Sequence, residues 1–511
     1  MIDGSILVGG KASHNDHKFR ARNPATGEVV GPGYSESTDA DVDQACALAV
    51  NASEAFGTLA PERRAAFLEA VGEQILAIGD ELIAVALAET GLPRARLEGE
   101  RGRTVSQLRM FAAEVRRGAW LDVTIDPALP DRVPPRTDLR RMNCPLGPVA
   151  VFGASNFPLA FSVAGGDTAA AFAAGCPVVV KGHPAHPGTG ELIGRAVVRA
   201  VAECGLPAGV FAFLPGTSNQ LGAALVAHPE IKAVGFTGSR DGGLALVGIA
   251  ARRAEPIPVY AEMSSINPVV LLPAALASRA SAMGTAFVGS LSLGAGQFCT
   301  NPGLVIARKG PDLDQFIEAA QSALCLTPKQ TMLTAGIEAA YQHGVAALDA
   351  NPATVRIDDR TAIGSALFMT TAQAFLADKS LGHEVFGVAS IIVQCSDSGE
   401  MTAVLRSLEG QLTATIHFDS ADHSAVAEML PTLQSKAGRL LANGWPTGVE
   451  VTPAMVHGGP FPATSDGRST SVGTLAMKRF LRPVCYQDIP EPLLPQPVQD
   501  ANPWNVPIRR D

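Results

Sequence analysis

The chain of 511 residues is poor in aromatic and charged residues and has no dense run of Lys or Arg. Aromatic residues make up 5% of the sequence and charged residues 17%, whereas apolar residues reach 47%. The formal net charge is −9 and the pI is about 5.6, so a basic surface that follows a phosphate backbone is not expected. We therefore predict no binding to nucleic acid, and the apolar content excludes a disordered chain.

Sequence motifs for a metal site are also missing. The cysteines are scattered, none forms a CxxC pair, and no His cluster has the spacing of a zinc site. We expect no metal and reduced thiols, as in a cytoplasmic protein. The eight cysteines are Cys46, Cys144, Cys176, Cys204, Cys299, Cys325, Cys395 and Cys485.

The sequence lacks a stretch with the character of a signal peptide or a membrane span. Its first residues contain no basic region followed by an apolar core, so we expect no secretory signal. Residues 142–180 hold no Lys or Arg, but Asn143, Pro158, Asp167 and several glycines interrupt them. Alternating strand and helix signals explain this segment better than a membrane span does.

What the sequence does contain is a repeated unit of short apolar strand, turn and helix. In residues 147–262 the strands read GPVAVFG, CPVVVKG, GVFAFLPG, KAVGFTGS and IPVYAE. The helices expected between them lie near 160–174, 187–203, 217–228 and 240–252. Fully apolar strands that alternate with helices predict a parallel sheet covered on both faces, as in dinucleotide-binding folds.

A second series of the same kind follows residue 267. Its strands read NPVVLL, GLVIAR, IIVQC, TATIHF and GRLLAN, with helices expected near 277–292 and 311–324. The length alone suggests about two to four domains. We therefore predict an α/β protein with two Rossmann-type parallel sheets.

Two segments stand outside these series. Residues 121–144 alternate apolar positions before a Pro-rich turn, which predicts a projecting hairpin or arm. The tail from residue 487 carries six prolines up to residue 507, which predicts an extended strap along the surface or along a neighbouring subunit.

Cys299 lies in the stretch GAGQFCTNPG, residues 294–303, where small flexible residues suggest a backbone bent to present one sulfur atom. A lone cysteine is more often an inert buried residue. The remaining chemistry of the chain decides between the two interpretations.

Three polar residues stand at the carboxyl ends of predicted strands. Glu262, in YAEMSSINP, suits a general base with a pKa raised by partial desolvation, or else a structural acid. Asn156, in GASNFP, suits an oxyanion donor or a helix cap. Lys181, in VVVKGHP, suits a ribose or phosphate contact or a solvated lysine. The carboxyl edge of a parallel sheet is the usual place for a ligand.

Two loops add weaker signals. GFTGSRDGG, residues 235–243, is a Gly-rich strand-to-helix turn whose N–H groups suit a pyrophosphate, although it is not GxGxxG. HEVFG, residues 383–387, places Glu384 and Phe386 in a loop where either suits a structural role as well.

The order and spacing of these motifs resemble the aldehyde dehydrogenase superfamily over nearly the whole chain. The matching stretches are PLGPVAVFGASNFP, PVVVKGHPA, GFTGS, YAEMSSINP, GAGQFCTNPG, HEVFG and HGGPFPAT. The resemblance implies NAD(P)-dependent oxidation of an aldehyde to a carboxylic acid through a cysteine thioester, with Cys299 as nucleophile, Glu262 as general base and Asn156 as oxyanion donor.

The resemblance also implies where a cofactor is held. Lys181 and the turn residues Gly238 and Ser239 look like contacts to the adenosine ribose and the pyrophosphate. Glu384 and Phe386 look like contacts to the nicotinamide ribose.

Two departures from the family pattern bear on the cofactor. NAD-preferring members commonly have a glutamate three residues after the strand-end lysine, and Pro184 stands there instead. We therefore expect NADP to be accepted and preferred over NAD, with His183 near the 2′-phosphate. Arg240 replaces a frequent threonine in the Gly-rich turn, which leaves the phosphate contacts there open.

The resemblance further implies a division of the chain. Residues 1–120 and 145–262 would form the dinucleotide-binding domain and residues 263–484 the catalytic domain. Residues 121–144 and 485–511 would form an oligomerisation arm and tail of a homodimer or homotetramer.

Within the superfamily, the stretches ETGLPRARLEGERGRT, KGHPAHPGT, EMSSINP and PTGVEVTPAMVHGGPFPAT look most like the branch that oxidises α-ketoglutaric semialdehyde (2,5-dioxovalerate) in sugar-acid and hydroxyproline breakdown. Arg103 and Gln107, one helical turn apart, would face a substrate carboxylate unless they lie on the surface. The remaining candidates for the pocket wall, with core packing as the alternative, are Phe157, Phe298, Thr300 and Phe461.

Three other functions stay open. An NADP-linked dehydrogenase of fatty or aromatic aldehydes would have a more apolar pocket. A CoA-acylating enzyme is disfavoured because Glu262, as a general base, favours water over CoA as the acyl acceptor. A catalytically silent binding protein on the same scaffold would not need both Cys299 and Glu262.

Overall fold

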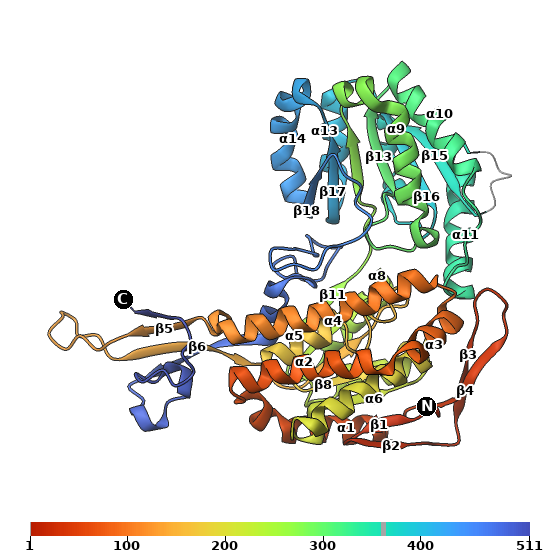
Figure 1. Cartoon of the computed structure of the whole chain (residues 1–511). Helices are drawn as coiled ribbons and strands as arrows, with labels where there is room; N and C mark the ends of the chain where they lie inside the picture. The colour runs from red at the N-terminus through yellow and green to blue at the C-terminus, as the bar shows by residue number, and fades with distance from the viewer. Residues whose placement is uncertain (1, 359–363, 511) are drawn as a thin grey trace.

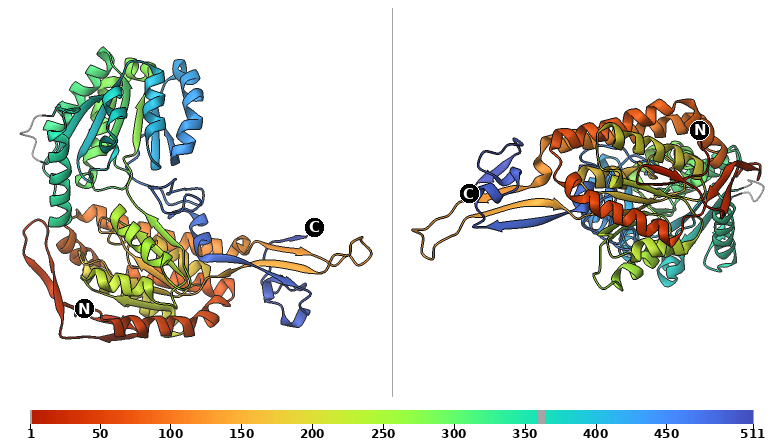
Figure 2. Two further views of the ribbon diagram at one scale, coloured as in Figure 1. Left: turned by 180° about the vertical axis from the view of Figure 1, so that it is seen from behind. Right: turned by 90° about the horizontal axis from the view of Figure 1, so that it is seen from below.

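The computed structural model describes residues 2–358 and 364–510. Its elements form two α/β lobes, each built on a mostly parallel sheet, and an arm that extends from the first lobe (Figure 1). The same arrangement is visible from behind and from below, where the arm projects well clear of both lobes (Figure 2).

The first lobe contains a seven-stranded sheet of order β11-β10-β7-β8-β9-β1-β2. The five strands expected within residues 147–262 are present and parallel to one another, whereas β1 pairs antiparallel with both β9 and β2 at one edge. The strands are β1 (Ile6–Val8), β2 (Lys11–Ser13), β7 (Val149–Phe152), β8 (Val178–Lys181), β9 (Phe211–Leu214), β10 (Ala233–Thr237) and β11 (Val259–Glu262).

Helices cover both faces of this sheet. The first begins at a capping box in which Thr38 and Asp41 bond each other's backbone, and the second has Pro61 in its first turn, where a missing N–H costs nothing. The helices are α1 (Asp39–Gly57), α2 (Pro61–Ile78), α3 (Asp80–Thr90), α4 (Arg94–Arg117), α5 (Gly166–Ala174), α6 (Pro187–Glu203), α7 (Asn219–Ala227) and α8 (Arg240–Ala251).

The start of α5 differs from the prediction, which placed it near residue 160. Gly165 is extended and the Ala154 N–H donates to the Phe161 carbonyl, so residues 153–165 form a compact loop before the helix begins at Gly166. Asn156 therefore lies in a loop and does not cap a helix. This leaves its side chain available to the site.

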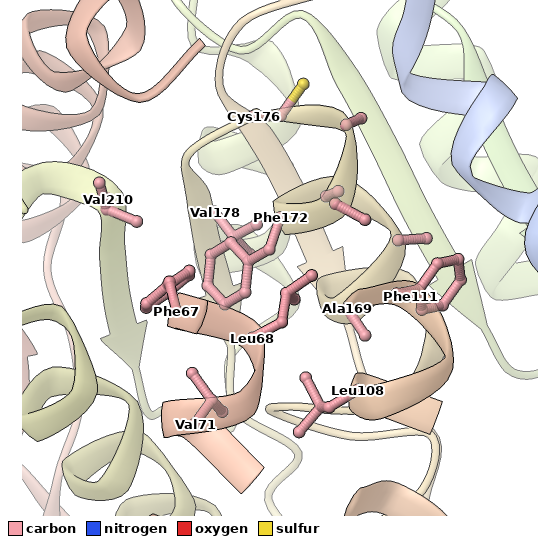
Figure 3. Close-up of a cluster of buried hydrophobic side chains, with 14 of the residues drawn as sticks. Phe67, Leu68, Val71, Leu108, Phe111, Ala169, Phe172, Cys176, Val178 and Val210 are labelled. Carbon is pink, nitrogen blue, oxygen red and sulfur yellow. The ribbon is translucent and has the colours of Figure 1, made fainter. Parts of the chain in front are cut away.

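The core of the first lobe lies between α2, α4, α5 and the sheet (Figure 3). Its aromatic rings meet edge to face, and the Phe67 and Phe172 centroids are 5.1 Å apart. The fully buried Arg64 donates to the carbonyls of Phe56, Gly57 and Leu59, which satisfies the backbone where α1 ends. This packing fixes the frame from which the polar strand ends project.

The second lobe contains a seven-stranded sheet of order β14-β15-β16-β13-β12-β17-β18, in which β14 alone of these strands is antiparallel to its neighbour. The strands are β12 (Pro268–Leu271), β13 (Leu304–Arg308), β14 (Val355–Arg356), β15 (Ala366–Thr371), β16 (Ala389–Cys395), β17 (Gln411–His417) and β18 (Ala437–Ala442). The helices are α9 (Pro273–Ser292), α10 (Pro311–Cys325), α11 (Ala335–Ala350), α12 (Ala372–Ala377), α13 (Ser398–Ser407) and α14 (His423–Lys436). The two parallel sheets that the sequence predicted are thus confirmed.

The arm is a hairpin, as predicted for residues 121–144, and the tail lies along it. Its sheet has the order β19-β6-β5-β20, formed by β5 (Val123–Asp126), β6 (Leu139–Pro145), β19 (Leu481–Gln487) and β20 (Ile508–Arg510). Arg140 ties the tail to the arm through Asp138, Glu491 and the Val498 carbonyl. Within the described residues the Pro-rich tail contains short 3-10 turns and no α-helix.

The remaining short elements connect these parts. They are the hairpin of β3 (Lys18–Arg22) and β4 (Val29–Ser35) and the 3-10 turns Ala119–Leu121, Ala208–Val210, Leu293–Gly296, Lys379–Gly382, Ser420–Asp422, Thr474–Phe480, Glu491–Leu493 and Gln496–Val498.

Residues 142–180, whose lack of basic residues would suit a membrane span, form parts of β6 and β8 and all of β7 and α5. Across the described residues, no helix has both the length and the apolar character needed to cross a membrane.

Candidate active site

The loop that carries Cys299 follows the 3-10 turn Leu293–Gly296. Gly294, Ala295 and Gly296 all have positive φ, of 59°, 59° and 69°. A Cβ on Gly296 would lie 2.2 Å from the backbone of Gly387, so only glycine fits there. The buried Asn267 side chain donates to the Cys299 carbonyl at 2.9 Å and holds the end of the loop.

The loop presents the sulfur of Cys299 to two buried side chains. The His457 Nε2 lies 3.3 Å from the Cys299 Sγ and 2.8 Å from the Glu262 Oε1. Ser471 Oγ donates to the other carboxylate oxygen of Glu262 at 2.7 Å. We call Cys299, Glu262 and His457 the catalytic cluster, a name for the candidate arrangement in which a thiol that suits a nucleophile lies beside a carboxylate that suits a base.

The pKa of Glu262 differs from the prediction, which was a raised value. Burial does raise it, but His457 and the hydrogen bond from Ser471 outweigh burial and hold the pKa of this carboxyl below its ordinary value. Burial, and next the Glu262 charge, raise the pKa of the Cys299 thiol well above its ordinary value. In the resting site the carboxylate is therefore ionised and the thiol keeps its proton.

Asn156 enters the site from the loop after β7. It is buried, and its Nδ2 donates to the Gln297 carbonyl at 2.9 Å, two residues before Cys299. Arg96 Nη2 donates to the Asn156 backbone carbonyl at 2.7 Å. These bonds hold the amide beside the cysteine loop, which suits the oxyanion role expected for it.

Neither Arg103 nor Gln107 of α4 lies on the open surface, the alternative considered for them, because Gln107 is buried and Arg103 is partly buried. Gln107 is 2% exposed. The Arg103 guanidinium carbon lies 5.6 Å and 5.1 Å from the ring centroids of Phe157 and Phe161, and its charge acts on the Cys299 thiol. Within the described part of the chain, the Arg103 Nε and Nη2 and both polar atoms of the Gln107 amide have no hydrogen-bond partner.

The aromatic wall beside Arg103 is a small buried cluster. Its rings are Phe157, Phe161 and Phe298, and the Phe157 centroid is 5.4 Å from Phe161 and 5.3 Å from Phe298. Phe461 is not part of this cluster: it is 56% exposed and lies beside Arg240, 5.9 Å from its guanidinium carbon. Thr300 is fully buried, and its hydroxyl accepts from the Gly448 N–H.

Lys181 is the last residue of β8, the central strand of the first sheet, and His183 follows it in the loop at the carboxyl end of the strand. The partly exposed Lys181 donates to the Gly216 carbonyl at 2.7 Å, and burial lowers its pKa to about 8. The His183 ring stacks on His186 with centroids 5.2 Å apart, and burial lowers its pKa well below the ordinary value. His183 is therefore neutral, which makes it an uncharged neighbour of any phosphate.

The Gly-rich turn lies where β10 leads into α8. Gly238 and Ser239 are exposed, and Ser239 Oγ accepts from the Gly242 N–H at 3.2 Å as the N-cap. Arg240 pairs with Glu409 of the second lobe at 2.8 Å. The turn thus opens the first turn of α8 to solvent, while Arg240 is directed toward the other lobe.

Glu384 and Phe386 border a small cavity in the second lobe, together with Ser265, Gly296 and Asn301. Burial raises the pKa of Glu384 to about 8. The cavity touches the cysteine loop through Gly296, which links these two residues to the catalytic cluster.

The catalytic cluster also has the composition of a metal site, although no sequence motif predicted one. One ligand atom from each of Glu262, Cys299 and His457 lies within 4.8 Å of the others. Such a set suits a soft divalent ion. A bound ion would occupy the sulfur lone pairs needed for attack, so we interpret the cluster as a nucleophile and its partners.

Three residues of the site were not identified from the sequence. His457 is the first residue of HGGPFPAT, a motif that was noted without a role for the histidine. Ser471 and Phe161 lie in stretches without a recognisable signal. Only folding brings residues 156, 262, 299 and 457 together, since they come from four separate loops or strand ends.

Comparison with known proteins agrees with this geometry. The model described as "Aldehyde dehydrogenase family" matches residues 11–341. Alpha-ketoglutaric semialdehyde dehydrogenase 2 of Azospirillum brasilense is 57% identical, over 100% of this chain and 99% of its own. The alpha-ketoglutaric semialdehyde dehydrogenase of Acinetobacter baylyi is 46% identical, over 98% and 96%.

Solved structures confirm the fold. A 1-pyrroline-5-carboxylate dehydrogenase from Thermus superposes with a TM-score of 0.80 at 20% identity and covers 95% of this chain and 93% of its own. The aldehyde dehydrogenase KauB from Pseudomonas aeruginosa gives 0.79 at 20% identity, with 95% and 97% covered.

Proposed function

The chain belongs to the aldehyde dehydrogenase family, and from that premise we propose that it oxidises α-ketoglutaric semialdehyde to 2-oxoglutarate. The names of two relatives similar over their full lengths support this substrate. One observation in the site supports it independently, namely the unpaired guanidinium of Arg103 beside Cys299.

Arg103 is partly buried, and leaving its Nε and Nη2 without hydrogen-bond partners costs free energy that is recovered when an anion binds. Arg103 offers Nε and Nη2, two donors that together match the two oxygens of a carboxylate. Gln107, one turn further along α4, offers an amide whose donor and acceptor are also free within the described residues. We propose that these two residues hold the carboxylate at the end of the semialdehyde that does not react.

The chemistry begins with the Cys299 thiol. Its proton passes to the Glu262 carboxylate, and the thiolate attacks the aldehyde carbon to form a C–S bond. The carbonyl π electrons move to oxygen, where the Asn156 amide N–H stabilises the negative charge. A nicotinamide cofactor, when bound, supplies the oxidant that converts this adduct to a thioester. Glu262 gives the proton it took from the thiol to solvent and becomes ionised again. It then deprotonates a water molecule, which attacks the thioester and breaks the C–S bond, so that the acid and the Cys299 thiolate are released and the proton on Glu262 can return to the sulfur.

The residues at the edge of the first sheet fit such a cofactor. The exposed first turn of α8 offers N–H groups to a pyrophosphate, and Gly238 is needed there because a Cβ would lie 2.7 Å from the Phe236 ring. Lys181 ends β8, the strand next to β7 in the sheet, and offers a cation to a ribose or phosphate group. Glu384 and Phe386 border the cavity next to the cysteine loop, where we place the nicotinamide ribose.

We propose that NADP is accepted and preferred over NAD. Pro184 contributes no negative charge beside Lys181, so a 2′-phosphate meets no carboxylate from that loop. The carboxylate that does act on Lys181 comes from Glu36, which accepts from the Thr217 N–H at 2.9 Å. Steady-state kcat/KM values for both cofactors test the preference, and a value for NAD well above that for NADP rejects it. The Glu36→Gln variant removes the Glu36 charge, and the same kcat/KM values then show how much this charge contributes to the cofactor preference.

The division of labour in the chain is also a proposal. We assign dinucleotide binding to residues 1–120 and 145–262, catalysis to residues 263–484, and assembly of a homodimer or homotetramer to residues 121–144 and 485–511. Residues 1, 359–363 and 511 of these ranges lie outside the described residues. The projecting arm supports the assembly role. The eight free cysteines support a reducing cytoplasm.

A dehydrogenase of fatty or aromatic aldehydes is the second candidate, and the Phe157, Phe161 and Phe298 cluster is the observation that favours it. The test is NADPH formation with α-ketoglutaric semialdehyde, hexanal and benzaldehyde. We expect kcat/KM to be highest for the semialdehyde by at least about tenfold, as for one charged hydrogen bond. Higher values for hexanal or benzaldehyde would transfer the assignment to the second candidate.

A further inference from the structure

His457 is the one polar side chain of the catalytic cluster to which the family resemblance assigns no role. Its Nε2 contacts both the Cys299 Sγ, at 3.3 Å, and the Glu262 Oε1, at 2.8 Å. The ring is 1% exposed, and its Nδ1 has no hydrogen-bond partner within the described residues. A single ring nitrogen therefore serves both the nucleophile and the base.

The surroundings determine which nitrogen carries the proton. An ionised carboxylate accepts only, so the bond to Glu262 requires a hydrogen on Nε2. A second hydrogen on Nδ1 would be buried without an acceptor, which is costly. The neutral ring with its hydrogen on Nε2 keeps the hydrogen bond to Glu262 and leaves only an uncharged lone pair without a partner on Nδ1, whereas the protonated ring would leave an N–H of a charged group without an acceptor there.

We propose that His457 is a positioning residue whose neutral Nε2–H stabilises a negative charge on either Glu262 or Cys299. This proposal rests on the proposed function only in taking Cys299 as the nucleophile. When the thiol ionises, its S–H bond breaks and an O–H bond forms on Glu262, so that one negative charge moves from oxygen to sulfur. The His457 Nε2–H lies within reach of both the Glu262 Oε1 and the Cys299 Sγ. It therefore has a negatively charged acceptor both before and after the proton moves from the thiol to the carboxylate.

The charged groups around the ring are consistent with this role. Glu262 of β11 and Cys299 contact it directly, and Phe161 covers it with a centroid distance of 6.4 Å. Ser471 Oγ donates to Glu262 Oε2 at 2.7 Å and also lies 3.0 Å from the His457 carbonyl, which can compete for the same hydrogen. Arg103 and Glu384 act on Cys299 with opposite charges. The N–H of His457 is the donor in contact with both anionic positions.

Two substitutions distinguish a neutral donor from a titrating base. A glutamine amide nitrogen reaches approximately the position of Nε2 and offers an N–H that does not titrate, whereas an asparagine amide reaches only the position of Nδ1. The proposal predicts that His457→Gln retains most of the function of the parent and that His457→Asn does not. His417→Asn is the matched control, since His417 is another buried histidine, and its ring packs against Trp445 with the centroids 4.7 Å apart.

The experiment measures the rate of Cys299 alkylation by iodoacetamide between about pH 6 and pH 10 on the full chain, with peptide mass spectrometry to identify the modified cysteine. This readout needs neither aldehyde nor cofactor. In the His457→Asn variant, we expect the pH at which the alkylation rate of Cys299 is half-maximal to rise by about one unit or more, because one charge-assisted hydrogen bond to the thiolate is lost. We expect His457→Gln and His417→Asn to stay close to the parent.

Each outcome decides the proposal. A His457→Asn profile that coincides with the parent overturns it, and so does a glutamine variant that shifts as far as the asparagine variant, because the ring would then act by titrating. If the asparagine variant does not fold, the glutamine profile decides alone: a midpoint near the parent supports the neutral donor and a raised one overturns it. A parent that alkylates as expected but does not oxidise the semialdehyde would reject the proposed substrate and leave the role of His457 standing.

Discussion

The catalytic cluster and the surface proposed for the cofactor differ in how their polar groups are held. Cys299, Glu262 and His457 are in mutual contact and largely removed from water. Ser239 is exposed and Lys181 is partly exposed, and each makes one local hydrogen bond. Groups that must meet a reacting atom in one geometry are fixed before the substrate arrives, whereas groups that bind an exchangeable ligand are left accessible.

The largest effect we predict is at Cys299. Replacing it with alanine removes the nucleophile, so NADP-dependent oxidation should fall by at least about 10³-fold. Titration of intrinsic fluorescence with NADP should give a Kd within about twofold of the parent, because a fixed catalytic cluster and an open cofactor surface bind separately. Cys325→Ala, at an exposed cysteine of α10, is the control. A Cys299→Ala variant that no longer binds NADP would contradict the prediction, because it would show that the catalytic cluster and the proposed cofactor surface do not bind separately.

The next largest effect is at Glu262. The Glu262→Gln variant keeps the shape of the side chain but cannot take a proton from water, so steady-state turnover should fall by about 10²–10⁴-fold. Because the pKa of Glu262 lies below its ordinary value, the carboxylate is ionised across the neutral range. In the parent, kcat should therefore show no decline from Glu262 protonation between pH 6 and pH 8.

Single-turnover measurements sharpen this prediction. If Glu262 acts mainly in releasing the acid, Glu262→Gln should still give a burst of NADPH and accumulate a thioester, which acid-quenched mass spectrometry detects as an adduct on Cys299. Absence of both would place the main role of Glu262 in ionising the thiol.

A smaller effect is predicted at Arg103, whose charge acts on Cys299 and whose Nε and Nη2 have no hydrogen-bond partner in the described part of the chain. Arg103→Met should lower kcat/KM for α-ketoglutaric semialdehyde by about 10–100-fold through a lost charged hydrogen bond, and leave hexanal unchanged. Arg109→Met is the matched control, because Arg109 is on the same helix and pairs with Glu73 at the surface. An equal loss for both aldehydes would show that Arg103 supports the site without recognising the substrate.

The smallest effect is predicted at Lys181 and depends on pH. Its pKa, lowered by burial to about 8, means that the cation is lost as pH rises through about 8. The affinity for NADP should therefore weaken several-fold between about pH 7 and pH 9, and bound phosphate would move the change to higher pH. Lys181→Met should show weaker binding at pH 7 and little further change with pH. A parent whose Kd is flat over this range would exclude a phosphate contact by Lys181.

Much of the fold was predictable from local pattern. The runs VAVF, VVVK and FAFL are apolar on both sides, which only a strand buried on two faces requires, and each is a parallel strand of the first sheet. The helix from Pro187 to Glu203 has the predicted bounds because Pro187 marks its first turn. The start of α5 was wrong because the loop before it is stabilised by a contact to Phe161 that has no local signal.

The site was predictable in part. Cys299, Glu262 and Asn156 were identified from their motifs, and the structure brings them to one place. The direction in which the Glu262 pKa is shifted was not predictable. It depends on His457 and Ser471, which are 195 and 209 residues further along the chain.

The sequence by itself determined the two parallel sheets, the bent loop around Cys299 and the polar residues at strand ends, because these follow from residue patterns within a few positions. Tertiary structure alone decided that His457 contacts both Cys299 and Glu262, that the Arg103 Nε and Nη2 have no hydrogen-bond partner among the described residues, and that Phe461 lies elsewhere. These are contacts between distant segments, and burial then sets which groups keep their protons.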